Sequence, residues 1–224
     1  MLCPGMTLDH DVLVLVNQRW TATPLDWWGA IVNASELWWP VAVLFVVLAA
    51  WRGGARGRMA VLVALLSVGL GDGVLVRVLK TATARPRPAH VLAGVRMVHL
   101  ADRQPRILAF KEPLRIDITP TGRDAPPPRS FPSGHAWNAF TIATVIALTW
   151  RRHGFIAYLP AAATAYARVY VGIHWPSDVL VSALAAPLFT FVLAGLCDQA
   201  MLLLPQRMTA AFAPLLAPQA PSPP

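Results

Sequence analysis

Residues 168–204 read RVYVGIHWPSDVLVSALAAPLFTFVLAGLCDQAMLLL and join a short polar motif directly to the longest apolar run of the chain. The run Pro176–Leu204 exceeds the ~20 residues that an α-helix needs to cross a bilayer. Its two charges, Asp178 and Asp198, stand near its ends. His174 comes just before Pro176, a residue type that favours the first turn of a helix. This stretch therefore predicts a membrane-spanning helix that begins directly after a polar motif.

Four further apolar stretches approach the same length. They are Leu37–Trp51, which is marginal, Met59–Leu79, Ala136–Trp150 and Phe155–Gly172. Of the 224 residues, 56% are hydrophobic and only 13% are charged, against ~25% charged in soluble domains. The mean hydropathy is +0.51. We therefore expect an all-α fold, a polytopic transmembrane helical bundle of about five spans with six as the alternative. The composition excludes an ordinary soluble domain, a coiled coil and a disordered tail.

The chain divides into three expected parts. Residues 1–30 form an N-terminal interfacial segment, because their apolar patch is too short to span a membrane. Residues 31–204 form the membrane domain, which includes a long extracytoplasmic loop at 89–131. Residues 205–224 are rich in Pro and Ala and predict a flexible tail.

The charge pattern orients the bundle. The net charge is +8, and 17 of the 19 basic residues are Arg; a GC-rich coding bias is the alternative source of that excess. Basic residues gather in the short segments Arg52–Arg58 and Arg151–His153 and at Arg207, which five spans place on one side. The positive-inside rule makes that side the cytoplasm. We expect a multi-pass protein of a bacterial inner membrane, with the 89–131 loop facing the periplasm or the exterior. No nucleic-acid-binding pattern accompanies the charge.

Three polar clusters stand at the outward ends of the predicted spans. They are Lys80–Pro88, Pro132–His135 and Arg168–Asp178. The five-span topology brings all three to the same membrane face. Each has an ordinary structural explanation when taken alone, such as an interfacial anchor, a turn or a helix cap. Their shared face and spacing favour one site.

The cationic members of these clusters indicate a phosphate-binding pocket. Lys80, Arg87 and Arg168 would repel one another without an anion between them, and Arg binds phosphate oxygens two at a time. Ser133 and Gly134 open a helix, where backbone N–H groups and the helix dipole favour an anion.

Two histidines indicate that the predicted pocket performs a reaction on the bound phosphate and does not only bind it. Asp178, four residues after His174, can accept the Nδ1 hydrogen and leave Nε2 as a nucleophile. His135, beside the phosphate-binding turn, can act as a general acid. No cluster of carboxylates offers hard oxygen ligands, so we expect no metal and no cofactor.

Together the clusters resemble the signature of the type 2 phosphatidic acid phosphatase superfamily, which also holds the vanadium haloperoxidases. That signature is Lys, six residues, Arg-Pro; then Pro-Ser-Gly-His; then Ser-Arg, five residues, His, three residues, Asp. The matches are Lys80 to Arg87-Pro88, Pro132–His135, and Arg168 to His174 to Asp178. Ala167 departs from the pattern, because the family usually has Ser there. The resemblance in span order covers roughly Leu37 to Leu204.

The resemblance implies a metal-independent phosphatase that forms a phosphohistidine. His174 would attack phosphorus, Asp178 would orient it and His135 would protonate the leaving group. The phosphate oxygens would be held by Lys80, Arg87, Ser133, Gly134 and Arg168. The expected partners are a phosphorylated lipid and the bilayer; the oligomeric state is not predicted.

The resemblance favours undecaprenyl diphosphate as the substrate. Phosphatidylglycerophosphate, phosphatidic acid and lipid A phosphate remain alternatives. A non-catalytic membrane binding or transport protein and a vanadate-dependent haloperoxidase are competing interpretations. For the intramembrane pair Asp72 and Arg77, five residues apart, we expect a structural role.

Overall fold

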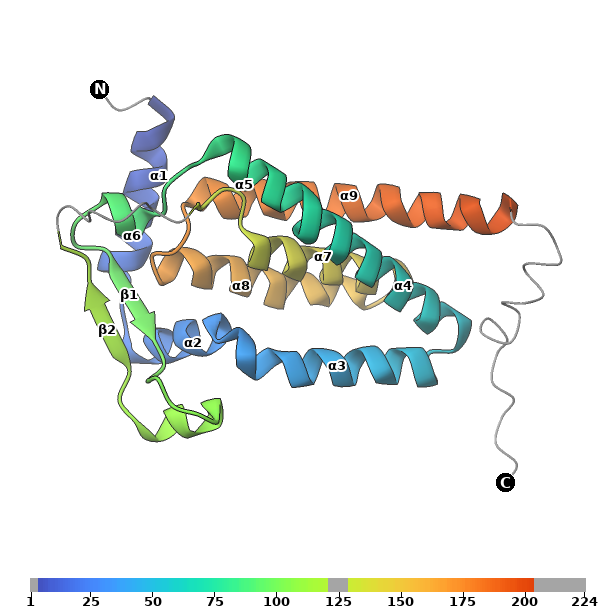
Figure 1. Ribbon diagram of the computed structural model, residues 1–224, viewed down its shortest axis with the longest axis horizontal. Helices are drawn as coiled ribbons and strands as arrows, with labels where there is room; N and C mark the ends of the chain where they lie inside the picture. Colours follow the sequence, from blue (N-terminus) through green and yellow to red (C-terminus); the bar gives the residue numbers. More distant parts are fainter. Residues whose placement is uncertain (1–3, 121–128, 204–224) are drawn as a thin grey trace.

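The computed structural model describes residues 4–120 and 129–203 and forms a helical bundle with a small two-stranded excursion at one end (Figure 1). In chain order the elements are α1 (Pro4–Val14), the π-helical turn η1 (Leu15–Arg19), α2 (Thr23–Asn33), α3 (Ser35–Arg52), α4 (Gly54–Leu70), the π-helical turn η2 (Gly71–Val76), α5 (Arg77–Thr83), α6 (Pro88–Val91), β1 (Arg96–His99), the 3₁₀ turn η3 (Arg106–Lys111), β2 (Arg115–Ile118), α7 (Gly134–Thr149), the 3₁₀ turn η4 (Gly154–Ala157), α8 (Tyr158–Tyr170) and α9 (Pro176–Leu203). The predicted helical bundle is confirmed. The predicted tail at 205–224 lies outside the described residues.

In the part of the chain that the structure describes, three helices are long and apolar enough to cross a membrane. They are α3, the continuous helix Gly54–Thr83 that contains α4, η2 and α5, and the part of α9 from Pro176 to Ala200. No residue of α3 is buried, and large side chains such as Trp39 and Phe45 are exposed. An apolar helix without protein cover requires lipid around it. The bundle is therefore a transmembrane one.

Two shorter helices occupy the middle of the bundle. α7 has 16 residues and α8 has 13, both below the ~20 residues of a full span. α7 packs against α4, α8 and α9, and the Trp137 indole fills the space beside Gly71, where any Cβ would collide with it. These two helices are among the five predicted spans, so the count of five spans stays a prediction.

The N-terminal segment packs into the main core at one end of the bundle. Leu13 and Val16 are buried in the cluster that contains Val95 and Tyr170. The Nδ2 group of Asn17 donates to the Tyr170 carbonyl at 2.6 Å, while its Oδ1 accepts from the backbone N–H of β1. α2 runs through residue 30 without a break. The predicted boundary between residues 30 and 31 stays a prediction.

The 89–131 loop carries the antiparallel pair β1–β2. Its anchor is Arg96, whose guanidinium donates to both oxygens of Asp26 on α2 at 2.9 and 3.0 Å. The Tyr170 hydroxyl at the end of α8 also donates to Asp26, at 2.7 Å. One buried carboxylate thus joins the loop, the N-terminal segment and the bundle.

Gly172, between α8 and α9, supports this junction. Its φ is +72°, and a Cβ would collide with the Val95 side chain and lie 2.9 Å from the Arg96 carbonyl oxygen. A left-handed non-glycine residue costs about 1–3 kcal/mol, and the collision adds to that.

We expect Gly172→Ala to lower the melting temperature of the detergent-purified protein by several degrees. Gly69→Ala is the matched control, because Gly69 lies in α4 with open space around its Cα, and alanine is the better helix former by about 0.5–1 kcal/mol. Equal melting temperatures for the two variants would contradict the role of Gly172. Differential scanning fluorimetry measures both.

Candidate active site

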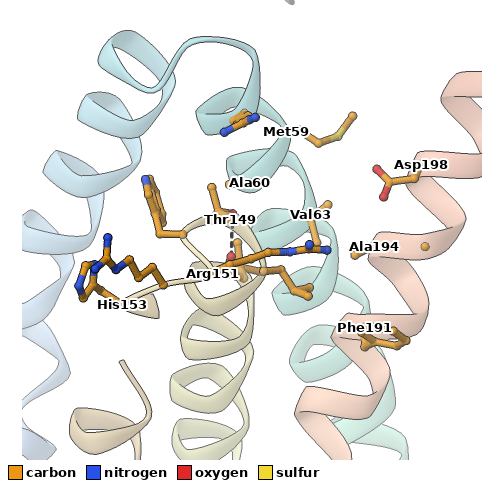
Figure 2. Close-up of a pocket in the computed structure, with 15 residues that line it drawn as sticks. Met59, Ala60, Val63, Thr149, Arg151, His153, Phe191, Ala194 and Asp198 are labelled. Carbon is orange, nitrogen blue, oxygen red and sulfur yellow. Dashed lines mark hydrogen bonds between the residues drawn. The ribbon is translucent and has the colours of Figure 1, made fainter. Parts of the chain in front are cut away.

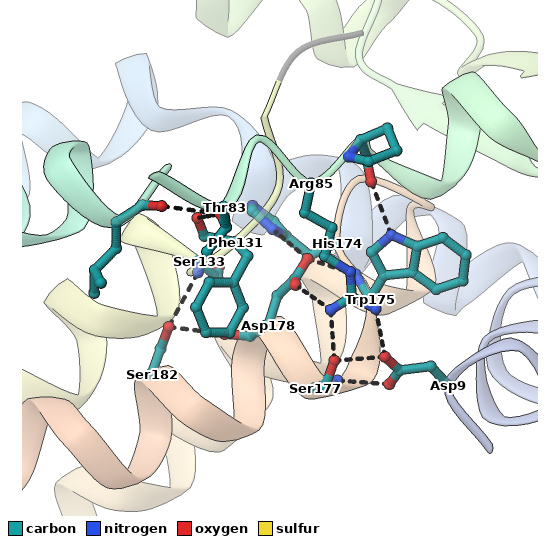
Figure 3. A network of polar contacts seen from close by, with 12 residues as sticks. Asp9, Thr83, Arg85, Phe131, Ser133, His174, Trp175, Ser177, Asp178 and Ser182 are labelled. Atoms are coloured by element: carbon teal, nitrogen blue, oxygen red, sulfur yellow. Dashed lines mark hydrogen bonds and ion pairs between the residues drawn. The ribbon is translucent and has the colours of Figure 1, made fainter. Parts of the chain in front are cut away.

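Asp178, in the first turn of α9, is the centre of a buried polar network (Figure 3). The carboxylate is fully buried. Its Oδ2 accepts from the backbone N–H of Trp175 at 3.0 Å and lies 3.4 Å from Nδ1 of His174. Its Oδ1 accepts from Arg85 at 2.8 Å. α9 begins at Pro176, as the sequence predicts, and this start places residues 174 and 178 side by side.

The imidazole of His174 is buried and oriented by Asp178. Its ring is 3% exposed, and its backbone N–H donates to the Arg168 carbonyl at 3.2 Å. Burial lowers the pKa of His174; the positive charges of Arg87 and Arg168 lower it further, while Asp178 opposes them. A hydrogen on Nδ1 faces the acceptor Asp178, so Nε2 carries the lone pair. A neutral, oriented imidazole is the form that acts as a nucleophile.

The three predicted phosphate-binding cations lie within electrostatic reach of one another. Arg168 is 4% exposed, and its buried Nε and Nη2 have no hydrogen-bond partner among the described residues; the same holds for Nε of Arg87. Burial lowers the pKa of Arg87. Leaving a buried charged donor unpaired costs free energy. These unpaired donors therefore favour the binding of an anion between Arg87 and Arg168.

The second cluster touches the third directly. Ser133 is the N-cap of α7: its hydroxyl accepts from the backbone N–H of Ala136 at 3.5 Å. The backbone N–H of Ser133 donates to the Asp178 carbonyl and to Ser182 Oγ. His135 follows in the first turn of α7 and is exposed. The helix opening that the sequence predicts at Ser133 and Gly134 is confirmed.

Gly134 lies against Asp72, a contact that the sequence analysis did not predict. A Cβ at this position would lie 2.6 Å from Oδ1 of Asp72. Asp72 belongs to η2 and accepts from the Asn138 amide at 2.8 Å. Arg77, by contrast, is exposed on the bundle surface. Asp72 thus lies beside the site, whereas Arg77 does not pair with it.

Two residues beside the predicted site, Arg85 and Asp9, escaped sequence reasoning. Arg85 donates to Asp178 and also to Asp9 of α1, at 2.6 Å. Asp9 accepts in addition from the backbone N–H of Ser177 at 2.8 Å and from its hydroxyl. The Arg85 guanidinium stacks over the Trp175 ring, 5.1 Å from its centroid. Arg85, Asp9 and Ser177 thus form a clamp of three bonded residues, in which Arg85 is the member that donates to the buried carboxylate.

The sequence held a weak signal for Arg85 and none for Asp9. Arg85 stands in the first cluster, but only Arg87 has the motif spacing from Lys80. The left-handed Ala84, with φ +46°, ends α5 and turns the chain, so that residues 85–87 return across the site. Asp9 is 169 residues from Asp178 in the chain, and only the fold brings them together.

The model of the PAP2 superfamily matches residues 59–200. An undecaprenyl-diphosphatase of Sulfolobus acidocaldarius is 32% identical over 105 residues, which are 46% of this chain and 50% of that protein. A putative undecaprenyl-diphosphatase of Escherichia coli, YbjG, is 43% identical over 58 residues, 25% of this chain and 29% of that protein. The chain spans half the length, or less, of these curated relatives.

Two crystal structures have a similar fold. LpxE of Aquifex aeolicus is 27% identical with a TM-score of 0.59, over 86% of this chain and 98% of that one. A transmembrane PAP2-type phosphatidylglycerolphosphate phosphatase of Bacillus subtilis is 22% identical with a TM-score of 0.57, over 88% of each chain; this likeness shows the fold alone. Since the family match covers well over half of the chain and includes all three clusters, this protein belongs to the PAP2 superfamily.

Proposed function

We propose that the protein is a metal-independent lipid phosphatase that forms a phosphohistidine on His174, with undecaprenyl diphosphate as substrate and undecaprenyl phosphate and inorganic phosphate as products. The observation that carries the proposal is the pair of cations beside a neutral His174, the buried Arg168 and the half-buried Arg87, whose buried donors have no partner among the described residues. The two curated relatives named as undecaprenyl-diphosphatases support this substrate.

In the first step, Nε2 of His174 attacks the terminal phosphorus. The N–P bond forms as the bond between phosphorus and the leaving oxygen breaks, and His135 gives that oxygen its proton. Asp178 stabilises the positive charge that develops on the imidazole. Lys80, Arg87 and Arg168, together with Ser133 and Gly134 at the start of α7, hold the oxygens on which negative charge builds.

In the second step, water attacks the phosphohistidine. His135, now neutral, takes a proton from the water as its oxygen bonds to phosphorus. The N–P bond breaks, its electron pair returns to Nε2 of His174 as the lone pair, and inorganic phosphate leaves. The carboxylate nearest to His174 is already bound by Arg85 and a backbone N–H. The reaction therefore uses fixed cations in place of a metal ion.

The site is positioned where a lipid substrate can reach it. It lies at one end of a bundle with lipid-facing helices, where a headgroup can enter from the bilayer. We place this end at the periplasmic or exterior face, as the loop charges favour. Phosphatidylglycerophosphate, phosphatidic acid and lipid A phosphate are the alternative substrates, and a panel of these lipids with purified protein distinguishes them by kcat/KM.

We expect His174→Ala to lose at least about 1000-fold in kcat, because it removes the nucleophile, and His135→Ala to lose about 100- to 10,000-fold, because it removes the general acid. Brief reaction with substrate labelled on the terminal phosphate should leave acid-labile, alkali-stable label on the wild type and none on His174→Ala. Chelators should leave the rate unchanged. Full activity in His174→Ala would contradict the mechanism.

The pH profile follows from the lowered pKa of His174. Only the neutral imidazole attacks, so activity is full above that pKa and falls as the pH drops through it. We expect the acid limb of kcat/KM to lie below pH 6.5, the ordinary value for histidine. An acid limb above 6.5 would show that the imidazole is not buried as described.

Arg85 is expected to act as a positioning residue through Asp178. Because a hydrogen bond to a charged group is worth about 1.5–3 kcal/mol, Arg85→Gln should lower kcat about 10- to 100-fold with a smaller change in KM. Asp9→Asn should have a weaker effect in the same direction. Arg103→Gln is the control, because Arg103 is exposed and pairs only with Glu112 among the described residues. A purely structural role would lower the melting temperature and leave kcat per folded molecule unchanged.

A further inference from the structure

A groove of about 850 Å³ opens at the end of the bundle opposite to the active site (Figure 2). Its walls come from the start of α4, the turn that follows α7 and the C-terminal half of α9. In Figure 1 this is the end where α3 turns into α4, whereas α1, β1 and β2 lie at the other end. The groove shares no lining residue with the catalytic clusters.

The floor of the groove is apolar and built from small side chains. Ala60, Val63 and Val145 form a buried cluster there, with Ala194 of α9 packed against it. The small side chains leave an open slot between α4 and α9, which Phe191 borders on the outside with 62% exposure. An apolar slot that opens sideways from a transmembrane bundle suits an acyl chain.

The rim of the groove is strongly basic. Arg56, Arg151 and Arg152 line it, and Asp198 is its one acidic lining residue. Arg151 and Asp198 stand on different walls (Figure 2). Among the described residues, no ion pair engages any of these three arginines. A guanidinium binds phosphate oxygens bidentately, so the rim complements an anionic headgroup.

Aromatic residues place the rim at the boundary between membrane and water. Trp150 lines the groove and is 50% exposed, and Trp51 at the end of α3 is 58% exposed. Exposed tryptophans gather at membrane–water interfaces. The arginines therefore stand at headgroup depth and the apolar slot lies at acyl-chain depth, which is the arrangement of a phospholipid.

We propose that this groove binds one anionic glycerophospholipid from the leaflet opposite to the active site. Its phosphate is bound by the basic rim that Arg56, Arg151 and Arg152 form, and one acyl chain lies over Ala60 and Ala194. Basic pockets between transmembrane helices bind anionic headgroups in this way. The site is distinct from the phosphate pocket around His174, and the proposal does not depend on the reaction performed there.

Native mass spectrometry of the detergent-solubilised full chain tests the proposal, with phosphatidylglycerol and phosphatidylcholine of identical acyl chains as probes. We expect one phosphatidylglycerol to bind the wild type in preference to phosphatidylcholine. The double variant Arg151→Gln/Arg152→Gln should weaken phosphatidylglycerol binding at least about tenfold, since each juxtamembrane arginine contributes about fivefold. Ala194→Trp should fill the slot and weaken the binding of both lipids.

The matched control is Arg103→Gln/Arg115→Gln, which removes the same charge from exposed residues at the other end of the molecule. It should bind phosphatidylglycerol like the wild type. Equal affinity of the wild type for the two lipids, or unchanged phosphatidylglycerol binding in Arg151→Gln/Arg152→Gln, would overturn the proposal. So would a dimer that Ala194→Trp abolishes, because a second copy would then occupy the groove. Melting temperatures confirm that each variant is folded.

Discussion

The buried carboxylate of Asp178 determines how the active-site end of this bundle is arranged. With no exposure to water, it must find all its hydrogen bonds inside the protein. The backbone N–H of Trp175, the guanidinium of Arg85 and the imidazole of His174 share its two oxygens. His174 and Trp175 belong to the turn before α9 and Arg85 to the turn after α5, so satisfying one charge also fixes these two pieces of chain relative to each other.

A second buried carboxylate, Asp26, holds segments of the chain together in the same way. Asp26 receives two hydrogen bonds from Arg96 and one from the Tyr170 hydroxyl. Tyr170 ends the helix that carries Arg168, and Gly172 then turns the chain toward His174. The loop and the N-terminal segment thus hold the turn that carries His174 from outside the bundle. The site needs this support, because its cations Arg87 and Arg168 repel one another when no anion lies between them.

The two ends of the bundle carry positive charge in different settings. At the active-site end, Arg168 is buried and Arg87 is half-buried, and their buried donors have no partner among the described residues. A low dielectric strengthens the contact of such donors with an anion. At the opposite end, Arg151 and Arg152 are exposed around an apolar slot. Burial therefore distinguishes the arginines at the two ends of the bundle and underlies the different roles that we propose for them.

Local spacing in the sequence was enough to predict the helical membrane bundle, the helix starts at Ser133 and Pro176, and the pairing of His174 with Asp178. Apolar run length and an i, i+4 contact are properties of one segment, so they can be read from it. The clamp formed by Arg85, Asp9 and Ser177 depended on the tertiary structure. Its members come from α1, the turn after α5 and the start of α9, and no periodicity records a contact between segments so far apart in the chain.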